Sequence, residues 1–399
     1  MKDFDVVIVG AGPGGIATAQ KCAESKLKTL VLEKDQEIGE PKRCGEGLGG
    51  GWVKRLNLKV SKQWAVQDIF GAVLYSPNEK KLEIRMEEIA GYVIERKIFE
   101  KVLARDAARA GAKFITKANV FEVIKEKGKV AGVKARVMGE EKEFFCDAVV
   151  AADGVESRTA RLAGLNTTNA LYHVDSGFQY EMAGIDIDSP DLIHLYFGEK
   201  ISPRGYVWVF PKGKDYANVG IGIAGDNPNT AKYFLDKWID SHPAIKKGSI
   251  IEVNGSSIPV GGFLEKMTLD GLIVIGDAAH HVNPIHGGGM GLAMEAGNIA
   301  AEVLAEAKQK NDFSDKTLSL YTKKWYEQRG NQLKGILKKR MMFESMKDKD
   351  FETIVSALTG EDILKLASGE MMESAKIITK KLIRHPGLIR IMLKYLKEK

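Results

Sequence analysis

Gly10, Gly12 and Gly15 form the pattern G-x-G-x-x-G directly after an apolar, β-branched run at residues 4–9. In this pattern the first glycine permits a tight turn, the second lets the backbone approach a pyrophosphate, and the third lets a helix pack closely on a sheet. Glu33 follows about 20 residues later, where a carboxylate can accept hydrogen bonds from ribose hydroxyls. These residues predict a dinucleotide site. The alternative is a structural glycine turn beside a surface glutamate.

Three further motifs are placed to meet the same ligand. Asp277 follows a buried strand, and a glycine run at 287–291 then opens a helix. An aspartate there can hold a ribityl hydroxyl, and the N–H groups of the helix start can lie beside a flavin ring. Asp153, after another buried strand, and Arg96, before a helix, complete the set. An NAD site does not need these extra parts, so the sequence predicts FAD.

Tyr206, Trp208 and Phe210 alternate with Val207 and Val209 along one predicted strand. Alternate residues of a strand share a face, so the three rings form one wall and the valines lie on the other side. Such a wall is either ordinary core or the lining of a site for a long hydrocarbon, which has no hydrogen-bonding groups. The residues alone leave both interpretations open.

Over most of residues 1–310 the glycine, Asp-Gly and Gly-Asp motifs resemble the p-hydroxybenzoate-hydroxylase-type flavoproteins. Two longer motifs are similar to those of geranylgeranyl reductases, above all the archaeal branch acting on digeranylgeranylglycerophospholipids. One is PKRCGEG at residues 41–47, and the other is Y-x-W-x-F-P at 206–211 followed by Gly220-x-Gly222. The resemblance implies an α/β fold (α+β overall), with a Rossmann-like FAD domain of glutathione-reductase type, an inserted antiparallel substrate domain and a C-terminal helical region.

The resemblance also implies roles for individual residues. Gly14 and Gly15 would meet the pyrophosphate, and Tyr206, Trp208 and Phe210 would line a tunnel for the isoprenoid. The other residues expected at the cofactor are Glu33, Cys44, Gly45, Gly47, Arg96, Val120, Asp277, Gly289 and Met290.

The implied reaction is saturation of geranylgeranyl C=C bonds by hydride transfer from reduced flavin. A dry tunnel would position the alkene and exclude water. The expected partners are an isoprenoid lipid and an electron donor left unassigned among ferredoxin, reduced flavin and NAD(P)H.

Cys44 lies beside Arg43 in a glycine-rich segment, and a neighbouring cation favours the thiolate. We interpret Cys44 as a candidate catalytic residue that positions its loop or assists proton delivery, or else as a small buried residue without chemistry. Cys22 and Cys146 are expected in the core. No metal is expected, because the adjacent His280 and His281 cannot face one site and three cysteines cannot form a closed zinc site. A histidine at the flavin edge stays an open alternative.

The pattern of elements begins with a strand at 4–9, a helix at 14–25 and a strand at 28–33, which form one βαβ unit. Residues 39–51 are expected to be loop. A helix, a short strand, a hairpin and a buried strand are expected next, at 97–110, 113–115, 119–136 and 147–151. Alternating strands follow at about 165–260, then a buried strand at 272–275, a helix at 290–307 and mostly helical chain at 314–399.

This order predicts a discontinuous FAD-binding domain with an insertion. Residues 1–60, 92–165 and 255–310 are assigned to the FAD domain, 61–91 and 166–254 to the substrate domain, and 311–399 to a helical region.

The formal charge is +6, and residues 372–399 alone contain eight Lys or Arg against two Glu. This basic, partly apolar tail is either a solvated helix or a surface for anionic lipid. No nucleic-acid-binding pattern occurs. We expect a cytoplasmic protein associated peripherally with a membrane, because neither a signal peptide nor a stretch of 18 apolar residues is present.

Two other functions compete with prenyl reduction. A flavin monooxygenase shares the glycine and aspartate motifs, but such enzymes usually read P-x-x-G-Q-G-x-N where this chain has PIHGGGM at 284–290. An electron-transfer flavoprotein that reduces quinone is the second alternative. Its iron–sulfur variety needs four cysteines, and this chain has three.

Overall fold

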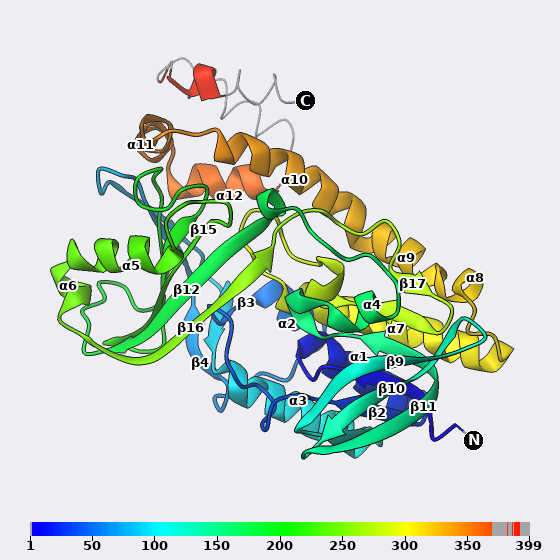
Figure 1. Cartoon of the computed structure of the whole chain (residues 1–399). Helices are drawn as coiled ribbons and strands as arrows, with labels where there is room; N and C mark the ends of the chain where they lie inside the picture. Colours follow the sequence, from blue (N-terminus) through cyan, green and yellow to red (C-terminus); the bar gives the residue numbers. More distant parts are fainter. Residues whose placement is uncertain (1, 369–380, 382–384, 386, 392–399) are drawn as a thin grey trace. The chain divides into compact units, whose positions relative to one another are not determined.

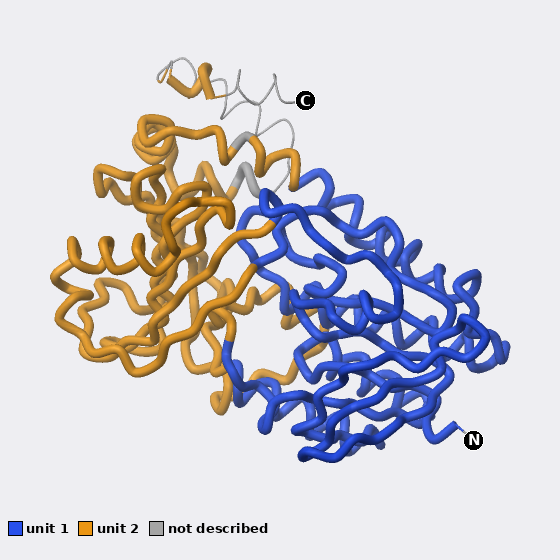
Figure 2. Tube along the Cα trace, viewed as in Figure 1, with its two compact units in different colours: residues 1–42, 96–173, 258–336 blue, residues 43–95, 174–257, 337–399 orange. Residues whose placement is uncertain are grey.

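A computed structural model describes residues 2–368, 381, 385 and 387–391 (Figure 1). The chain divides into two compact units, each assembled from three separate segments (Figure 2). Unit 1 comprises residues 1–42, 96–173 and 258–336, and unit 2 comprises 43–95, 174–257 and 337–399. The basic part of the C-terminal tail lies mostly outside the described residues, so its two interpretations stay open.

Unit 1 is built on a sheet whose central strands are parallel. The order is β17-β18-β11-β1-β2-β8, and β10 and β9 extend one end of β11 as an antiparallel meander. Apolar, β-branched runs form the buried centre, because both faces of such a sheet are covered. The strands are β1 (Phe4–Val9), β2 (Thr29–Leu32), β8 (Lys113–Ile115), β9 (Ala118–Glu126), β10 (Lys129–Val137), β11 (Glu140–Ala151), β17 (Thr268–Leu269) and β18 (Leu272–Val274).

Three long helices belong to this unit, and α1 packs against both others. Small residues on α1 allow the close approach: a Cβ at Gly14 would lie 3.0 Å from the Ala293 carbonyl oxygen on α7. The helices are α1 (Pro13–Glu24), α3 (Arg96–Ala110) and α7 (Met290–Lys310), and the short α4 (Arg158–Leu162), α8 (Asp315–Leu318) and α9 (Leu320–Trp325) complete the unit.

Unit 2 is built on a seven-stranded sheet in the order β16-β12-β15-β14-β13-β5-β6, antiparallel except where β13 pairs with β5. A smaller sheet has the order β3-β7-β4. The large sheet contains β5 (Gly71–Tyr75), β6 (Lys81–Arg85), β12 (Val174–Ala183), β13 (Ile193–Tyr196), β14 (Tyr206–Pro211), β15 (Tyr216–Ala224) and β16 (Ser249–Pro259). The small one contains β3 (Gly47–Gly49), β4 (Ala65–Ile69) and β7 (Gly91–Ile94).

One face of the large sheet forms the core of unit 2. Val207, Val209, Val219 and Ile221 pack there against α5 (Ala231–Asp240), whose Leu235 is fully buried. The remaining helices of the unit are α2 (Gly50–Arg55), α6 (Pro243–Lys246), α11 (Asp348–Ala357) and α12 (Gly360–Ser368). Helix α10 (Asn331–Glu344) is divided after residue 336 between the two units.

The fold class matches the prediction of a Rossmann-like α/β domain with an inserted antiparallel sheet. Residues 39–51 differ from the expected loop, because β3 pairs with β7 and α2 begins at Gly50. This pairing groups residues 43–60 with unit 2 rather than with the nucleotide-binding part. The helical chain after residue 311 is divided between the two units instead of forming a region of its own.

Candidate functional site

The glycine loop of unit 1 joins β1 to α1. Gly10 has φ +102°, and a Cβ there would lie 2.8 Å from the carbonyl carbon of Ala152. A Cβ at Gly15 would overlap the carbonyl oxygen of Gly10. These two positions require glycine because the backbone itself occupies the space, and the result is a helix that starts directly at the sheet edge.

Gly12 differs from its neighbours, since a Cβ built there meets no described atom within 4 Å. It is the N-cap residue of α1, and no described side chain caps this helix start. The first N–H groups of a helix lack internal partners and carry a partial positive charge. The N-terminus of α1 therefore offers donors and open space to an anion.

Glu33 lies at the end of β2, beside the same loop. Its carboxylate accepts hydrogen bonds from the backbone N–H groups of Ala11, at 2.7 Å, and Asp35, at 3.0 Å. The side chain is half-buried. It therefore braces the glycine loop and keeps acceptor capacity at the position where a ribose is expected.

Asp277 lies after β18, and a Cβ built at Gly289 would come within 3.0 Å of its Oδ1. Gly289 is the N-cap residue of α7, and Met290 is the first residue of this helix. Burial raises the pKa of Asp277, whereas the positive charge of Arg96 opposes that rise. Four predicted cofactor residues are thus linked here: Asp277, Gly289, Met290 and Arg96. The Nε of Arg96 also donates to Glu100 at 2.6 Å.

Asp153 follows β11, in the loop whose backbone closely approaches Gly10. Its Oδ2 accepts from the N–H of Thr159 at 2.7 Å, whereas its buried Oδ1 has no partner among the described residues. Burial is also the main reason that the pKa of Asp153 is raised. A buried carboxylate oxygen without a partner is costly, so this loop is suited to a ligand that donates a hydrogen bond.

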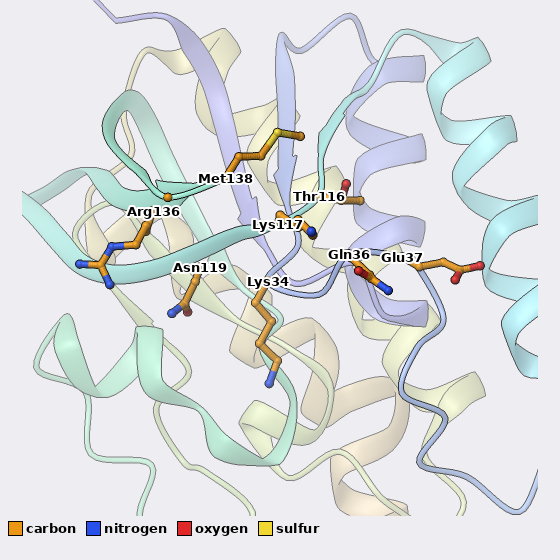
Figure 3. A pocket seen from close by; sticks show the side chains of 9 residues that line it. Lys34, Gln36, Glu37, Thr116, Lys117, Asn119, Arg136 and Met138 are labelled. Atoms are coloured by element: carbon orange, nitrogen blue, oxygen red, sulfur yellow. The ribbon is translucent and has the colours of Figure 1, made fainter. Parts of the chain in front are cut away.

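A cavity of about 840 Å³ opens at the end of β2, between that strand and the β9–β10 hairpin (Figure 3). Lys34 follows Glu33 directly, and Asn119 precedes Val120, so the cavity adjoins two predicted cofactor positions. The lining is mixed polar and charged: Lys34, Gln36, Glu37, Thr116, Lys117, Asn119, Arg136, Met138 and Gly139.

His280 and His281 follow β18, and both side chains are buried. The ring nitrogens of His280 lie 2.6 Å from the Gly262 carbonyl and 3.1 Å from that of Thr167. His281 is fully buried and stacks on Trp325 at 3.8 Å, and burial lowers its pKa well below the usual value. Within the described part of the chain, no group of three His, Cys, Asp or Glu side chains could hold a metal ion.

In unit 2, β14 carries the three aromatic rings that the sequence predicts on one face, Tyr206, Trp208 and Phe210, which form the aromatic row. Tyr206 and Trp208 have ring centroids 6.0 Å apart, and Trp208 and Phe210 have theirs 6.2 Å apart. Val207 and Val209 belong to the core on the other face. The shared face is therefore confirmed, and the rings lie outside the core that the valines and α5 form.

Gly220 explains how the indole of Trp208 fits. It is the register partner of Trp208 on β15, and a Cβ there would lie 2.8 Å from Nε1 and closer still to two ring carbons. The first glycine of the G-x-G motif therefore makes room for this ring. Nε1 also donates to Gln179 Oε1 at 2.8 Å.

The loop at residues 44–47 lies against the same row. A Cβ at Gly45 would be 3.4 Å from Trp208 Nε1, and one at Gly47 would be 3.0 Å from Phe210 Cε2. Cys44 is half-buried, and its sulfur accepts the backbone N–H of Glu46 at 3.2 Å. Residues predicted for the cofactor and residues predicted for the substrate thus meet within one unit.

The aromatic row continues beyond β14. Phe197 lies 5.8 Å from Tyr206, measured between ring centroids, and stacks on Phe351 of α11 at 5.7 Å. Phe343 of α10 contacts both phenylalanines edge to face. Neither α10 nor α11 was expected to extend the row, because no periodic signal links these distant segments.

Sequence reasoning also missed the polar residues that hold the loop. Gln179 donates to the Cys44 carbonyl at 3.1 Å, and Asn218 donates to the Gly45 carbonyl at 3.2 Å. Lys212 bonds to Glu46 at 2.9 Å. Lys212 could have been noticed, since it follows the Y-x-W-x-F-P motif directly, whereas Gln179 and Asn218 carry no local signal.

Cys22 and Cys146 are fully buried, as predicted. Burial raises the pKa of both thiols, that of Cys146 to about 12. In the described residues no helix is both long enough and apolar enough to span a bilayer.

Comparisons with known protein families match three stretches of the chain. Residues 173–258, which contain β12, β14 and β15, match the family described as geranylgeranyl reductase catalytic domain. Residues 4–183 match pyridine nucleotide-disulphide oxidoreductase, and residues 242–338 match squalene epoxidase.

Individual relatives cover nearly the whole chain. It is 39% identical to the digeranylgeranylglycerophospholipid reductase of Methanocaldococcus jannaschii over 99% of its own length and 98% of that protein. It is 42% identical to the Thermoplasma acidophilum protein of the same name, over 81% of this chain and 83% of the relative. A crystal structure described as geranylgeranyl bacteriochlorophyll reductase-like, from T. acidophilum, matches with a TM-score of 0.87 and 37% identity, covering 96% and 100% of the two chains.

The residues of unit 1 fit the cofactor of this family. Three features of unit 1 suit a ligand with phosphates and hydroxyls. They are the open space at Gly12, the starts of α1 and α7, which no described side chain caps, and the buried Oδ1 of Asp153. FAD is that ligand. With an FAD-binding unit and a geranylgeranyl reductase catalytic region in one chain, the protein belongs to the geranylgeranyl reductase family of FAD-dependent oxidoreductases.

Proposed function

We propose that this chain reduces the C=C bonds of geranylgeranyl groups on digeranylgeranylglycerophospholipids, and that it works in the cytoplasm at the membrane surface. The observation that carries the substrate class is the row of Tyr206, Trp208 and Phe210, which lies outside the valine core. A row of aromatic rings suits a long hydrocarbon. The names of the relatives support the lipid.

Unit 1 supplies the residues that would hold FAD. The N–H groups at the start of α1 would bind the pyrophosphate, and Glu33 would accept from a ribose hydroxyl. Asp277 and the start of α7 would hold the ribityl chain and the ring edge. The cavity lined by Lys34, Gln36 and Asn119 would receive the adenine end. Bound in its reduced form, FAD supplies the hydride that the isolated alkene needs.

The residues of unit 2 would orient the alkene and exclude water. An isolated C=C bond accepts hydride poorly, so its alignment contributes much of the rate. Trp208 is fixed by Gly220 on one side and by its bond to Gln179, so it is a rigid part of the wall. Cys44, in the loop whose Gly45 and Gly47 lie against the row, is the candidate for positioning the loop or for proton delivery.

The decisive test combines the reconstituted protein with a defined lipid. FAD-loaded protein, reduced with dithionite under argon, is mixed with digeranylgeranylglyceryl phospholipid in detergent, and the lipid is analysed by mass spectrometry. We expect the mass to rise by one H₂ per double bond while the flavin is reoxidised. Unchanged lipid with an FAD-loaded, reduced protein would refute the proposal.

The same experiment separates the competing functions. A monooxygenase would add an oxygen atom to the product and would need O₂ and NAD(P)H. A quinone reductase would oxidise the flavin with a quinone and leave the lipid unchanged. Replacing dithionite in turn by reduced ferredoxin, free reduced flavin and NAD(P)H assigns the donor.

The membrane surface is supported by the eight Lys or Arg within residues 372–399. Each basic residue near an anionic bilayer contributes about 1 kcal/mol of attraction, and salt screens it. We expect sedimentation with phosphatidylglycerol vesicles that weakens as salt is raised. Binding that is absent, or insensitive to salt, would refute a surface role for this tail.

A further inference from the structure

Lys212 carries a fully buried ammonium group in unit 2, directly after the aromatic strand β14. Its Nζ lies 2.9 Å from Glu46, 2.5 Å from Glu95 and 3.3 Å from Glu181. The side chain of Glu46 is fully buried as well. Burying charged groups costs desolvation free energy, so a buried cluster of this kind is expected to have a structural or functional role.

In this cluster one ammonium group faces three carboxyl groups. Burial alone lowers the pKa of Lys212, but the surrounding carboxylates outweigh it and raise the value to about 12. Burial raises the pKa of Glu181, and Lys212 only partly opposes that rise. The surrounding carboxylates therefore favour the charged form of Lys212.

Glu46 connects this cluster to the loop at residues 44–47. Its backbone has φ +69°, a left-handed conformation that is costly for a residue with a side chain. In that conformation its N–H donates to the Cys44 sulfur at 3.2 Å, while its carboxylate bonds to Lys212 and, at 2.8 Å, to Asn218. The buried ion pair thus holds the backbone turn that faces the Cys44 thiol.

The loop at residues 44–47 also lies against the aromatic row. A Cβ at Gly45 or Gly47 would touch Trp208 or Phe210, so a small shift of the loop changes the surface beside these rings. Lys212 follows Phe210 by two residues, directly after β14, and its Nζ bonds to Glu46 of the loop. Two sequence motifs that are far apart in the chain are joined by one ammonium group.

We propose that Lys212 is a positioning residue, which through Glu46 fixes the loop at 44–47 against Trp208 and Phe210. It holds the Cys44 thiol and the adjoining backbone in the one arrangement that suits the alkene. The proposal rests on the proposed function for its catalytic meaning. The fixing of the loop is independent of it and is measurable in protein without FAD.

The test measures how fast iodoacetamide alkylates Cys44 in the FAD-free protein, with peptide mass spectrometry as the readout. Cys22 and Cys146 are fully buried and serve as internal controls for unfolding. In Lys212→Met we expect alkylation of Cys44 to accelerate about tenfold or more, because a bond to a charged group is lost. Trypsin cleavage after Arg43 should accelerate in parallel.

Two further variants make the result interpretable. Lys212→Met with Glu46→Gln leaves no uncompensated carboxylate at Glu46, so it tests the loop even where the single variant fails to fold. Glu95→Gln is the matched control, because Glu95 contacts the same ammonium but lies outside the loop. It should leave the alkylation rate of Cys44 unchanged. Wild-type rates in a folded Lys212→Met protein, or equal acceleration in Glu95→Gln, would overturn the proposal.

Catalysis supplies the last readout. With the lipid assay above, the folded double variant should lose about tenfold in kcat with a smaller change in KM, since the loop orients rather than binds. Equal kcat would overturn the catalytic meaning of the loop. If the wild-type protein reduces no lipid but Lys212→Met still accelerates alkylation of Cys44, the proposed function is refuted and the fixing of the loop by Lys212 is retained.

Discussion

Replacing Gly220 with alanine is a sharp test of the aromatic row. The added methyl group would lie 2.8 Å from Trp208 Nε1 and closer to two ring carbons, so the indole must move. Trp208 is buried and its Nε1 is bonded to Gln179, so a movement of the indole strains or breaks that bond.

The cost follows from these contacts. Overpacking a well-packed site costs about 1–3 kcal/mol, and losing one hydrogen bond costs about 1 kcal/mol. Replacing glycine by alanine returns about 0.4–1 kcal/mol through the unfolded state. We therefore expect Gly220→Ala to lower the free energy of unfolding by about 1–3 kcal/mol.

Gly222 is the matched control two residues further along β15. A methyl group there would lie 3.8 Å from the nearest atom of Trp208, which is ordinary contact. We expect Gly222→Ala to change the free energy of unfolding by less than about 1 kcal/mol.

Urea unfolding of the FAD-free protein, followed by tryptophan fluorescence, measures both variants. Trp52, Trp64, Trp208 and Trp238 belong to unit 2, and only Trp325 belongs to unit 1, so the signal reports mainly on the relevant unit. FAD affinity should stay at the wild-type value, because the predicted ligands of FAD lie largely in unit 1. If the two alanine variants are equally stable, Trp208 does not pack on Gly220 and the account of the row is wrong.

Three other perturbations address different parts of the chain. Glu33→Ala should weaken FAD binding about 10–100-fold, as expected for losing bonds to a charged group, measured by flavin fluorescence titration; unchanged affinity would contradict the ribose role. Because the folded-state pKa of Asp277 is raised, the carboxylate destabilises the FAD-free protein as pH rises through that pKa. Asp277→Asn should therefore raise the melting temperature of the FAD-free protein at pH 7 and bind FAD more weakly. The rise in melting temperature should disappear below about pH 4, where Asp277 is protonated in both folded and unfolded protein. A rise that persists in acid would contradict a raised pKa for Asp277. Arg340 bonds to Asp175 at 2.8 Å in a buried position, so Arg340→Ala should cost about 3–5 kcal/mol in urea unfolding, and a loss below about 1 kcal/mol would show that the pair is exposed.

Much of unit 1 follows directly from local sequence. The predicted strand at 4–9 is β1 to the residue, the helix at 97–110 is α3 within one residue, and the hairpin expected at 119–136 is formed by β9 and β10. These elements have strong signals: buried parallel strands are continuous apolar runs, and glycines mark where the backbone closes on itself. The residues of the glycine loop, Glu33 and Asp277 could be placed for the same reason.

Unit 2 was harder to predict because its interactions join distant segments. The strand β3 was missed, since three residues rich in glycine have little strand propensity and form only because β7 pairs with them. The cluster at Lys212 joins residues more than a hundred positions apart in the chain. Alternation predicted which face the rings of β14 share, but not that Gln179 and Asn218 reach across to the loop.

The way each unit is cut into three segments has a consequence for biosynthesis. In unit 1, β1 pairs with β11, and β11 pairs in turn with β18, so the sheet is incomplete until residues 272–274 have left the ribosome. Helix α7, which covers α1, is made later still. The nascent chain must therefore keep its apolar N-terminal strand out of aggregates while more than half of the polypeptide is translated. Truncations anywhere before α7 should be captured by chaperones or proteases instead of yielding a stable nucleotide-binding fragment.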